Sequence, residues 1–137
     1  MELNPNDANG LAQRGLVLAY AGRAEEGINA IREAMRLNPF HPDWYWAALA
    51  VPLYAARRYE EALEADRHIA GWRNSWHLAR LAGCYGQLGR LEDARAQAAE
   101  VLRQNPEFKL SAVSLRYRDP EDIQHVLEGM RKAGLPE

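Results

Sequence analysis

The sequence predicts an all-α protein built from repeated pairs of helices. The phrase Met-x-Leu-Asn-Pro occurs twice, ending at Pro5 and at Pro39, 34 residues apart, and a third Asn-Pro ends at Pro106. A fixed period of this size is typical of one supersecondary unit stacked on copies of itself. Ala, Leu, Arg and Glu dominate the composition, and no alternating apolar run bounded by turn residues predicts a strand.

The first helix pair is expected at residues 7–40. Asp7 is a suitable N-cap for its first helix, Gly22 breaks the chain between the two helices, and Pro39 prevents the second helix from continuing. Residues 1–6 align with the stretch that ends at Pro39, so they are expected to be the end of a truncated preceding repeat. Met1 therefore need not be the true start of the protein.

Two further pairs are expected at residues 41–74 and 75–106. In the second pair, Arg57-Arg58 occupies the turn where the other pairs have Gly-Arg, and Gly71 is a plausible stop signal for its second helix. Pro52 lies inside the first helix of this pair, where its missing backbone N–H should kink the helix.

After Pro106 the period stops, and residues 107–137 are expected to form a C-terminal helical cap. Residues 110–117 are long enough for one or two helical turns. Asp119-Pro120 then predicts a helix start, because it combines a capping side chain with Pro at the first helical position. Four apolar residues follow at helical spacing and form one stripe, and Gly134 predicts the end. Such a helix would lay its apolar face on the last pair and expose a polar face to water.

These patterns resemble the tetratricopeptide repeat (TPR) family, in which each repeat is a helix–turn–helix of 34 residues. The first repeat matches at Leu11, Gly15, Leu18, Gly22, Ile31, Ala34 and Pro39. The second matches at Trp46, Leu49, Ala50, Leu53 and Ala62 but lacks the turn Gly and the closing Pro. The third matches at Leu78, Leu81, Ala82, Tyr85, Gly89, Ala94, Ala98, Val101 and Pro106. The resemblance implies a right-handed TPR superhelix of three helix pairs with a C-terminal capping helix, acting as a non-catalytic protein–protein interaction module.

The tail adds a narrower resemblance. The stretches 117–122 and 127–137, with 38–45 and 76–80, look like bacterial signalling proteins whose C-terminal TPR array follows a class III nucleotide cyclase domain or a winged-helix DNA-binding domain. This resemblance implies the C-terminal regulatory or sensory domain of such a protein, for example a nucleotide cyclase. The TPR domain of a winged-helix transcriptional regulator is an alternative.

Composition limits the cellular compartments and the classes of partner that are expected for this chain. The formal net charge is −2, with 17 basic and 19 acidic residues, so nothing favours nucleic acid as a partner of this segment. A single cysteine, Cys84, excludes an internal disulfide framework and suits a reducing compartment. No apolar run is long enough for a membrane span, and no secretory signal opens the chain. A cytoplasmic location without membrane contact is therefore expected.

The residue types that usually carry catalysis, His, Cys, Asp and Glu, occur in patterns that a purely structural role explains. The four histidines form no HExxH motif and no i, i+4 pair with another His or Cys, so no metal site is expected. Acidic pairs at Glu25-Glu26, Glu60-Glu61 and Glu92-Asp93 recur at the start of each second helix, where carboxylates stabilise the positive helix end. Cys84 is expected to be a buried packing residue. The sequence therefore predicts no enzyme and no cofactor.

The TPR resemblance implies that the first helix of each pair lines an inner groove. By position, the groove residues are Asn9, Ala12, Leu16, Tyr20, Trp44, Ala47, Val51, Tyr54, Trp76, Ala79, Arg80, Gly83 and Gln87. Only Arg80 matches the basic clamp with which some TPR proteins hold acidic C-terminal tails. The aromatic side chains instead predict a groove for an apolar peptide or an amphipathic helix.

Two alternatives remain open for these features. Aromatic residues at helical spacing often pack in cores, as expected for Trp46, and Trp44 and Trp76 could pack against neighbouring helices or the C-terminal tail. The chain could also be a structural spacer or a homo-oligomerisation element. In that case it would self-associate through the N-terminal face that a truncated repeat leaves uncovered.

Overall fold

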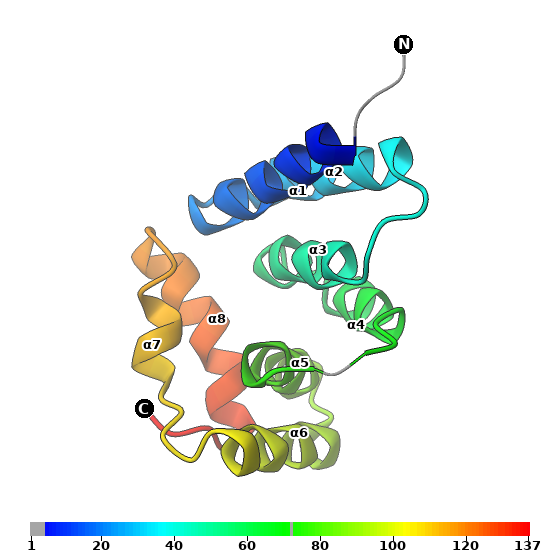
Figure 1. Cartoon of the computed structure of the whole chain (residues 1–137). Helices are drawn as coiled ribbons and strands as arrows, with labels where there is room; N and C mark the ends of the chain where they lie inside the picture. The colour runs from blue at the N-terminus through cyan, green and yellow to red at the C-terminus, as the bar shows by residue number, and fades with distance from the viewer. Residues whose placement is uncertain (1–4, 72) are drawn as a thin grey trace. The chain divides into compact units, whose positions relative to one another are not determined.

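The computed structural model describes residues 5–71 and 73–137, and this part of the chain is all-helical (Figure 1). The helices are α1 (Pro5–Tyr20), α2 (Ala24–Leu37), α3 (Trp44–Ala55), α4 (Tyr59–Arg67), α5 (Ser75–Gln87), α6 (Leu91–Gln104), α7 (Leu110–Ser114) and α8 (Pro120–Lys132). The all-α prediction is confirmed. The chain divides into two compact units, the first ending at Ala70 and the second beginning at Gly71.

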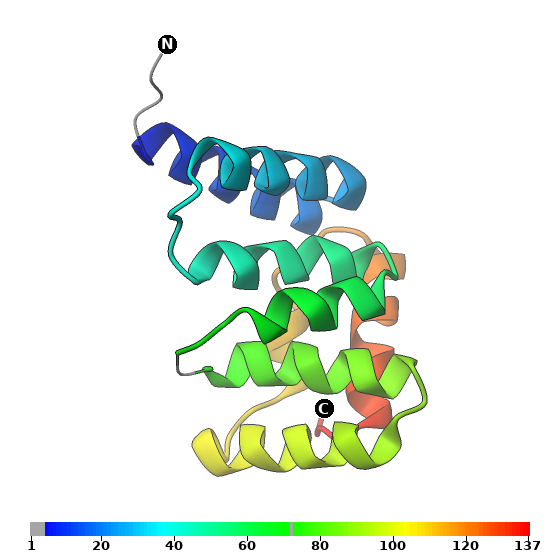
Figure 2. The same ribbon diagram turned by 90° about the vertical axis from the view of Figure 1, so that its right-hand side faces the viewer.

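The first unit consists of two helical hairpins, α1–α2 and α3–α4. Helix α3 packs against α1, α2 and α4, and Figure 2 shows it directly beside the first hairpin. Every residue from Ala47 to Tyr54 is buried. This explains why α3 is apolar on all sides, whereas the outer helix α2 has one apolar stripe ending in Ile31 and Ala34.

Helices α1 and α2 approach so closely that glycine is required on both. A Cβ on Gly15 would lie 2.5 Å from Cγ1 of Ile31 and 2.8 Å from the carbonyl oxygen of Gly27. A Cβ on Gly27 would in turn lie 2.6 Å from the carbonyl oxygen of Gly15 and 3.4 Å from Cβ of Pro52. Helix α3 continues through Pro52 to Ala55. The 3.4 Å distance places this proline against the glycine contact of the first hairpin.

The same turn joins the helices of all three hairpins, α1–α2, α3–α4 and α5–α6. Its second residue has positive φ: 87° at Gly22, 64° at Arg57 and 77° at Gly89. The N–H of the arginine that follows donates to a carbonyl five residues earlier, at 2.8, 2.8 and 2.9 Å respectively. These are the hydrogen bonds of a left-handed helix cap.

That arginine also pairs with the acid three residues later, in the first turn of the second helix. The pairs are Arg23–Glu26 at 2.5 Å, Arg58–Glu61 at 2.8 Å and Arg90–Asp93 at 2.9 Å. Each acid also lies at the helix end where a negative charge is favoured. The three hairpins therefore share turn geometry, hydrogen bonds and charge pattern.

The start of α1 differs from the expectation. The helix begins at Pro5, two residues before the predicted cap Asp7, and Pro is favoured at a first helical position. Pro5 thus opens a helix, whereas Pro39 follows one. Residues 1–4 of the predicted preceding repeat lie outside the described residues.

Helix α4 is shorter than the sequence indicates. It ends at Arg67, before the predicted stop at Gly71, and Ile69 is buried beyond its end. The N–H of Ala70 donates to Oδ2 of Asp43 at 2.9 Å instead of continuing the helix. Asp43, which immediately precedes α3, therefore competes with the helical carbonyls for the N–H of Ala70. The hydrogen bond joins the chain that leaves α4 to the chain that enters α3.

The second unit contains the hairpin α5–α6 and the C-terminal helices α7 and α8. Helix α8 begins where Asp119-Pro120 predicts, and the Asp119 carboxylate accepts a hydrogen bond from the N–H of Glu121 at 2.8 Å. It ends at Lys132, and Gly134 two residues beyond has a φ of 94°. Figure 1 shows α8 running across α5, its main packing partner, and it contacts α6 less.

Candidate interaction surfaces

The predicted groove residues of α1 are only partly open. Asn9 is half-buried, and its Oδ1 accepts a hydrogen bond from the hydroxyl of Tyr45 at 2.5 Å. Ala12 is fully buried in a cluster with Tyr45. Leu16 and Tyr20 are half-buried and remain partly accessible.

The predicted groove residues of α3 are mostly inside the protein. Ala47, Val51 and Tyr54 are buried, with at most 8% of each residue exposed. Trp44 is half-buried, and its ring centroid lies 4.5 Å from that of Tyr45. The structure therefore brings Asn9 and Trp44 together around the buried ring of Tyr45, a residue outside the predicted set.

Two of the predicted groove residues of α5, Trp76 and Gln87, are contacted by the C-terminal part of the same unit. The ring of Trp76 contacts the ring of Phe108 edge-on at 5.6 Å, and the guanidinium of Arg116 lies 4.2 Å from its centroid. Gln87 donates from Nε2 to the carbonyl oxygen of His125 at 3.2 Å. Ala79 and Gly83 are buried, and Arg80 is half-buried. Binding of a peptide by any of these residues stays a prediction.

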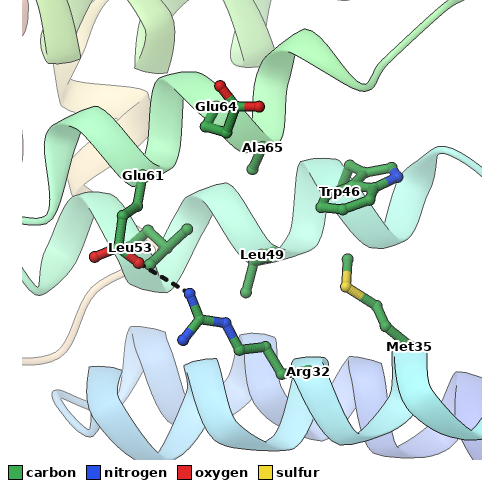
Figure 3. A pocket seen from close by; sticks show the side chains of 8 residues that line it. All are labelled: Arg32, Met35, Trp46, Leu49, Leu53, Glu61, Glu64 and Ala65. Carbon is green, nitrogen blue, oxygen red and sulfur yellow. Dashed lines mark hydrogen bonds and ion pairs between the residues drawn. The ribbon is translucent and has the colours of Figure 1, made fainter.

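A second surface, not foreseen in the sequence, is a cleft of about 340 Å³ in the first unit. Its lining residues are Arg32 and Met35 of α2, Trp46, Leu49 and Leu53 of α3, and Glu61, Glu64 and Ala65 of α4. Figure 3 shows the leucines forming the floor, with Met35 and Trp46 at one end and the Arg32–Glu61 pair at the other. The volume is at the lower end of the range for small-ligand pockets.

A chain of ion pairs closes the polar end of the cleft. Glu61 pairs with Arg32 at 2.9 Å and with Arg58 at 2.8 Å, and Arg58 also pairs with Glu25 at 3.0 Å. Hydrogen bonds from Arg58 and Arg32 lower the pKa of Glu61 below its ordinary value. The hydrogen bonds that Arg58 donates to Glu61 raise the pKa of Arg58. The chain of charges joins α2 to the start of α4.

Trp46 marks the other end of the cleft. Its ring is stacked on His68 with centroids 3.9 Å apart, and the His41 ring meets it in an edge-to-face arrangement with centroids 5.5 Å apart. The sequence assigned Trp46 to the core, but the structure places it half-buried on the cleft wall. The spacing of Trp46, Leu49 and Leu53 does indicate a common helix face; only the tertiary arrangement shows that this face is partly open.

Groups with catalytic potential are dispersed. Within residues 5–71 and 73–137, no cluster of three or more His, Cys, Asp or Glu side chains could hold a metal ion. Cys84 is buried in α5. Of the recurring acids, Glu25, Glu26, Glu61 and Asp93 pair with arginines. A search of the same residues finds no helix with the length and apolarity needed to cross a bilayer.

Comparison with models of protein families, with curated proteins and with solved structures finds no match to this chain.

Proposed function

We propose that the chain is a non-catalytic protein–protein interaction module of the TPR type, with repeats at 7–40, 41–74 and 75–106. The observation that supports this most is the threefold repetition of one hairpin turn, with its arginine–acid pair, at Arg23, Arg58 and Arg90. Regular repetition of one helical pair is the signature of solenoid proteins, which commonly use extended surfaces for binding.

The resemblance of the tail supports a more specific setting. In this proposal the module is the C-terminal regulatory domain of a bacterial cytoplasmic signalling protein, such as a nucleotide cyclase. A winged-helix transcriptional regulator is the alternative parent protein. In either parent, the domain would bind a partner or dock on the output domain.

The partner in this proposal is a protein segment with an apolar face. The half-buried side chains of Leu16, Tyr20 and Trp44 on α1 and α3 offer apolar and aromatic contact area, and aromatic residues contribute strongly to protein interfaces. The charged residues near the cleft are already paired with one another, so they provide no strong charge for a ligand.

The test is a selection of amphipathic helical peptides against the immobilised full chain, followed by affinity measurement. Leu16→Asp should weaken the selected peptides about tenfold or more, because it puts a charge in an apolar contact. Val17→Asp is the matched control, since Val17 is the next residue on the same helix and is 64% exposed on another face. Equal affinities for the two variants would contradict binding at this face.

A second candidate function is self-association through the exposed side of α1. Val17 is a large apolar residue on that side, with Gly10, Gln13 and Arg14 also exposed around it. Light scattering over a range of concentrations separates the candidates. A mass that rises with concentration, and falls to that of the monomer in Val17→Asp, would support self-association; a constant monomer mass would exclude it.

A further inference from the structure

The face of α5 that contacts α8 is shaped to receive a helix at close range. A Cβ on Gly86 would lie 2.2 Å from the carbonyl oxygen of Gly129 and 3.3 Å from its Cα. The two backbones therefore touch where the helices cross, and a side chain larger than hydrogen at position 86 would prevent this contact with the buried Gly129. Around this crossing, α8 buries Val126, Leu127 and Met130.

Polar contacts fix the register of α8 on this face. The side-chain amide of Gln87 donates from Nε2 to the carbonyl oxygen of His125 at 3.2 Å and accepts from Nζ of Lys132 at 3.3 Å. One glutamine on α5 thus contacts two positions on either side of Gly129. Apolar anchors on one stripe with flanking polar contacts are the pattern of a helix bound in a groove.

Residues 107–137, the C-terminal segment, form hydrogen bonds and an ion pair among themselves. The N–H of Leu110 donates to the carbonyl oxygen of Pro136 at 2.9 Å, and Arg131 pairs with Glu137 at 2.5 Å. Helix α8 carries its own N-cap, Asp119, so it needs no group of α5 or α6 to begin. The connection from α6 passes through exposed residues 105–107.

The C-terminal segment also covers the part of α5 where a groove ligand was predicted to bind. It contacts Trp76 through Phe108 and Arg116, and Gln87 through α8. We propose that the C-terminal segment is a built-in ligand of α5, and that the third hairpin binds a partner by exchanging this segment for an amphipathic helix of the same kind. That helix would carry glycine at the crossing and apolar residues at the positions of Val126, Leu127 and Met130. The inference rests on the proposed interaction function.

Hydrogen exchange of the unmodified full chain tests whether the C-terminal segment separates. If it is a ligand, the amides of α8 exchange through an opening that leaves α5 and α6 protected, with α8 exchanging at least about tenfold faster. If α8, α5 and α6 exchange through a single opening at the same rate, the segment is a fixed part of the core and the proposal is overturned.

Peptide exchange tests whether the site accepts the same helix from outside. A fluorescent peptide of residues 107–137 is titrated into the full chain and into a full chain carrying Val126→Ser and Met130→Ser. In the unmodified chain the tethered segment competes at high effective concentration, so the variant should bind the peptide at least about tenfold more tightly. A peptide carrying Gly129→Leu is the control, because it keeps helix-forming capacity but places a large side chain at the crossing.

Each result of the titration decides the question. Binding to the variant by the unmodified peptide alone supports the proposal. Equal binding by both peptides, no binding, or loss of exchange protection in α5 and α6 of the variant would overturn it. The Leu16→Asp experiment concerns the first unit, so the interaction function can stand when the exchange of the C-terminal segment fails, and the two failures are distinguishable.

Discussion

The first and second hairpins have the same turn but different interiors. In α1–α2, Gly15 faces the large side chain of Ile31, and the two backbones nearly touch. Counted from the shared turn, Ala50 and Asp66 are the corresponding residues of α3–α4. The second helix also differs in length, with 14 residues in α2 and nine in α4.

This comparison separates what the repeated hairpin requires from what it tolerates. The turn hydrogen bonds recur even though Arg57 replaces glycine at a positive φ. The residue on the second helix differs between the hairpins, whereas the facing position on the first helix always holds a small residue, Gly15, Ala50 or Ala82. Turn geometry is therefore the conserved element within this chain, and interhelical contact adapts to the side chains.

The close contact of the first hairpin gives the largest predicted effect. Gly15→Leu should lower the free energy of unfolding of the first unit by about 3 kcal/mol, because the new side chain collides with Ile31 and with backbone. Chemical denaturation followed by hydrogen exchange in α1 and α2 measures it. Gly10→Leu, on the same helix with no atom within 4 Å of a Cβ, should have little effect or stabilise slightly. Similar losses in both variants would refute the packing argument.

The turn comparison predicts the next effect, with opposite signs in two hairpins. Arg57→Gly should stabilise the second hairpin, and Gly89→Ala should destabilise the third, each by about 1 kcal/mol, because only glycine adopts positive φ without strain. No atom lies within 4 Å of a Cβ on Gly89, so the backbone alone is tested there. Thermal unfolding of the two variants checks the signs; two changes in the same direction would show that the turns are not equivalent.

The link between the first two hairpins predicts an effect of similar or smaller size. Tyr45→Phe removes the hydroxyl that donates to Asn9 and should cost about 1 kcal/mol. Asn9→Ala and the double variant complete a double-mutant cycle in urea unfolding. A coupling of zero would mean that this hydrogen bond does not join the hairpins.

The smallest predicted effect concerns the ion pairs at the cleft. The pKa of Glu61 is lowered in the folded protein, so its stabilising contribution is present at neutral pH and is lost as pH falls through that lowered pKa. Glu61→Gln should therefore destabilise slightly at neutral pH and not at all in stronger acid. Glu60→Gln is the matched control, because Glu60 lies in the same helical turn. Urea unfolding at several pH values compares them, and identical pH profiles would remove any role for the pairs.

Local signals in the sequence predicted most of the secondary structure. The Gly-Arg turns and the Asp119-Pro120 start were predictable because each depends on a few neighbouring residues. The early end of α4 was not, since Asp43 captures the N–H of Ala70 from 27 residues away. The packing of α8 on α5 and the partial exposure of Trp46 also depend on tertiary structure, which the spacing of residues along one helix does not specify.

The contact between Gly15 and Ile31 has a consequence for the evolution of this protein. Within the chain, glycine at the position of Gly15 accompanies a large partner, and alanine at Ala50 or Ala82 accompanies Asp66 or Ala98. Sequences that descend from the same ancestor should therefore show covariation of these two positions. A lineage that acquires alanine at position 15 is expected to carry a smaller residue at position 31 and a wider separation of α1 from the carbonyl of Gly27, because a Cβ at position 15 meets both groups.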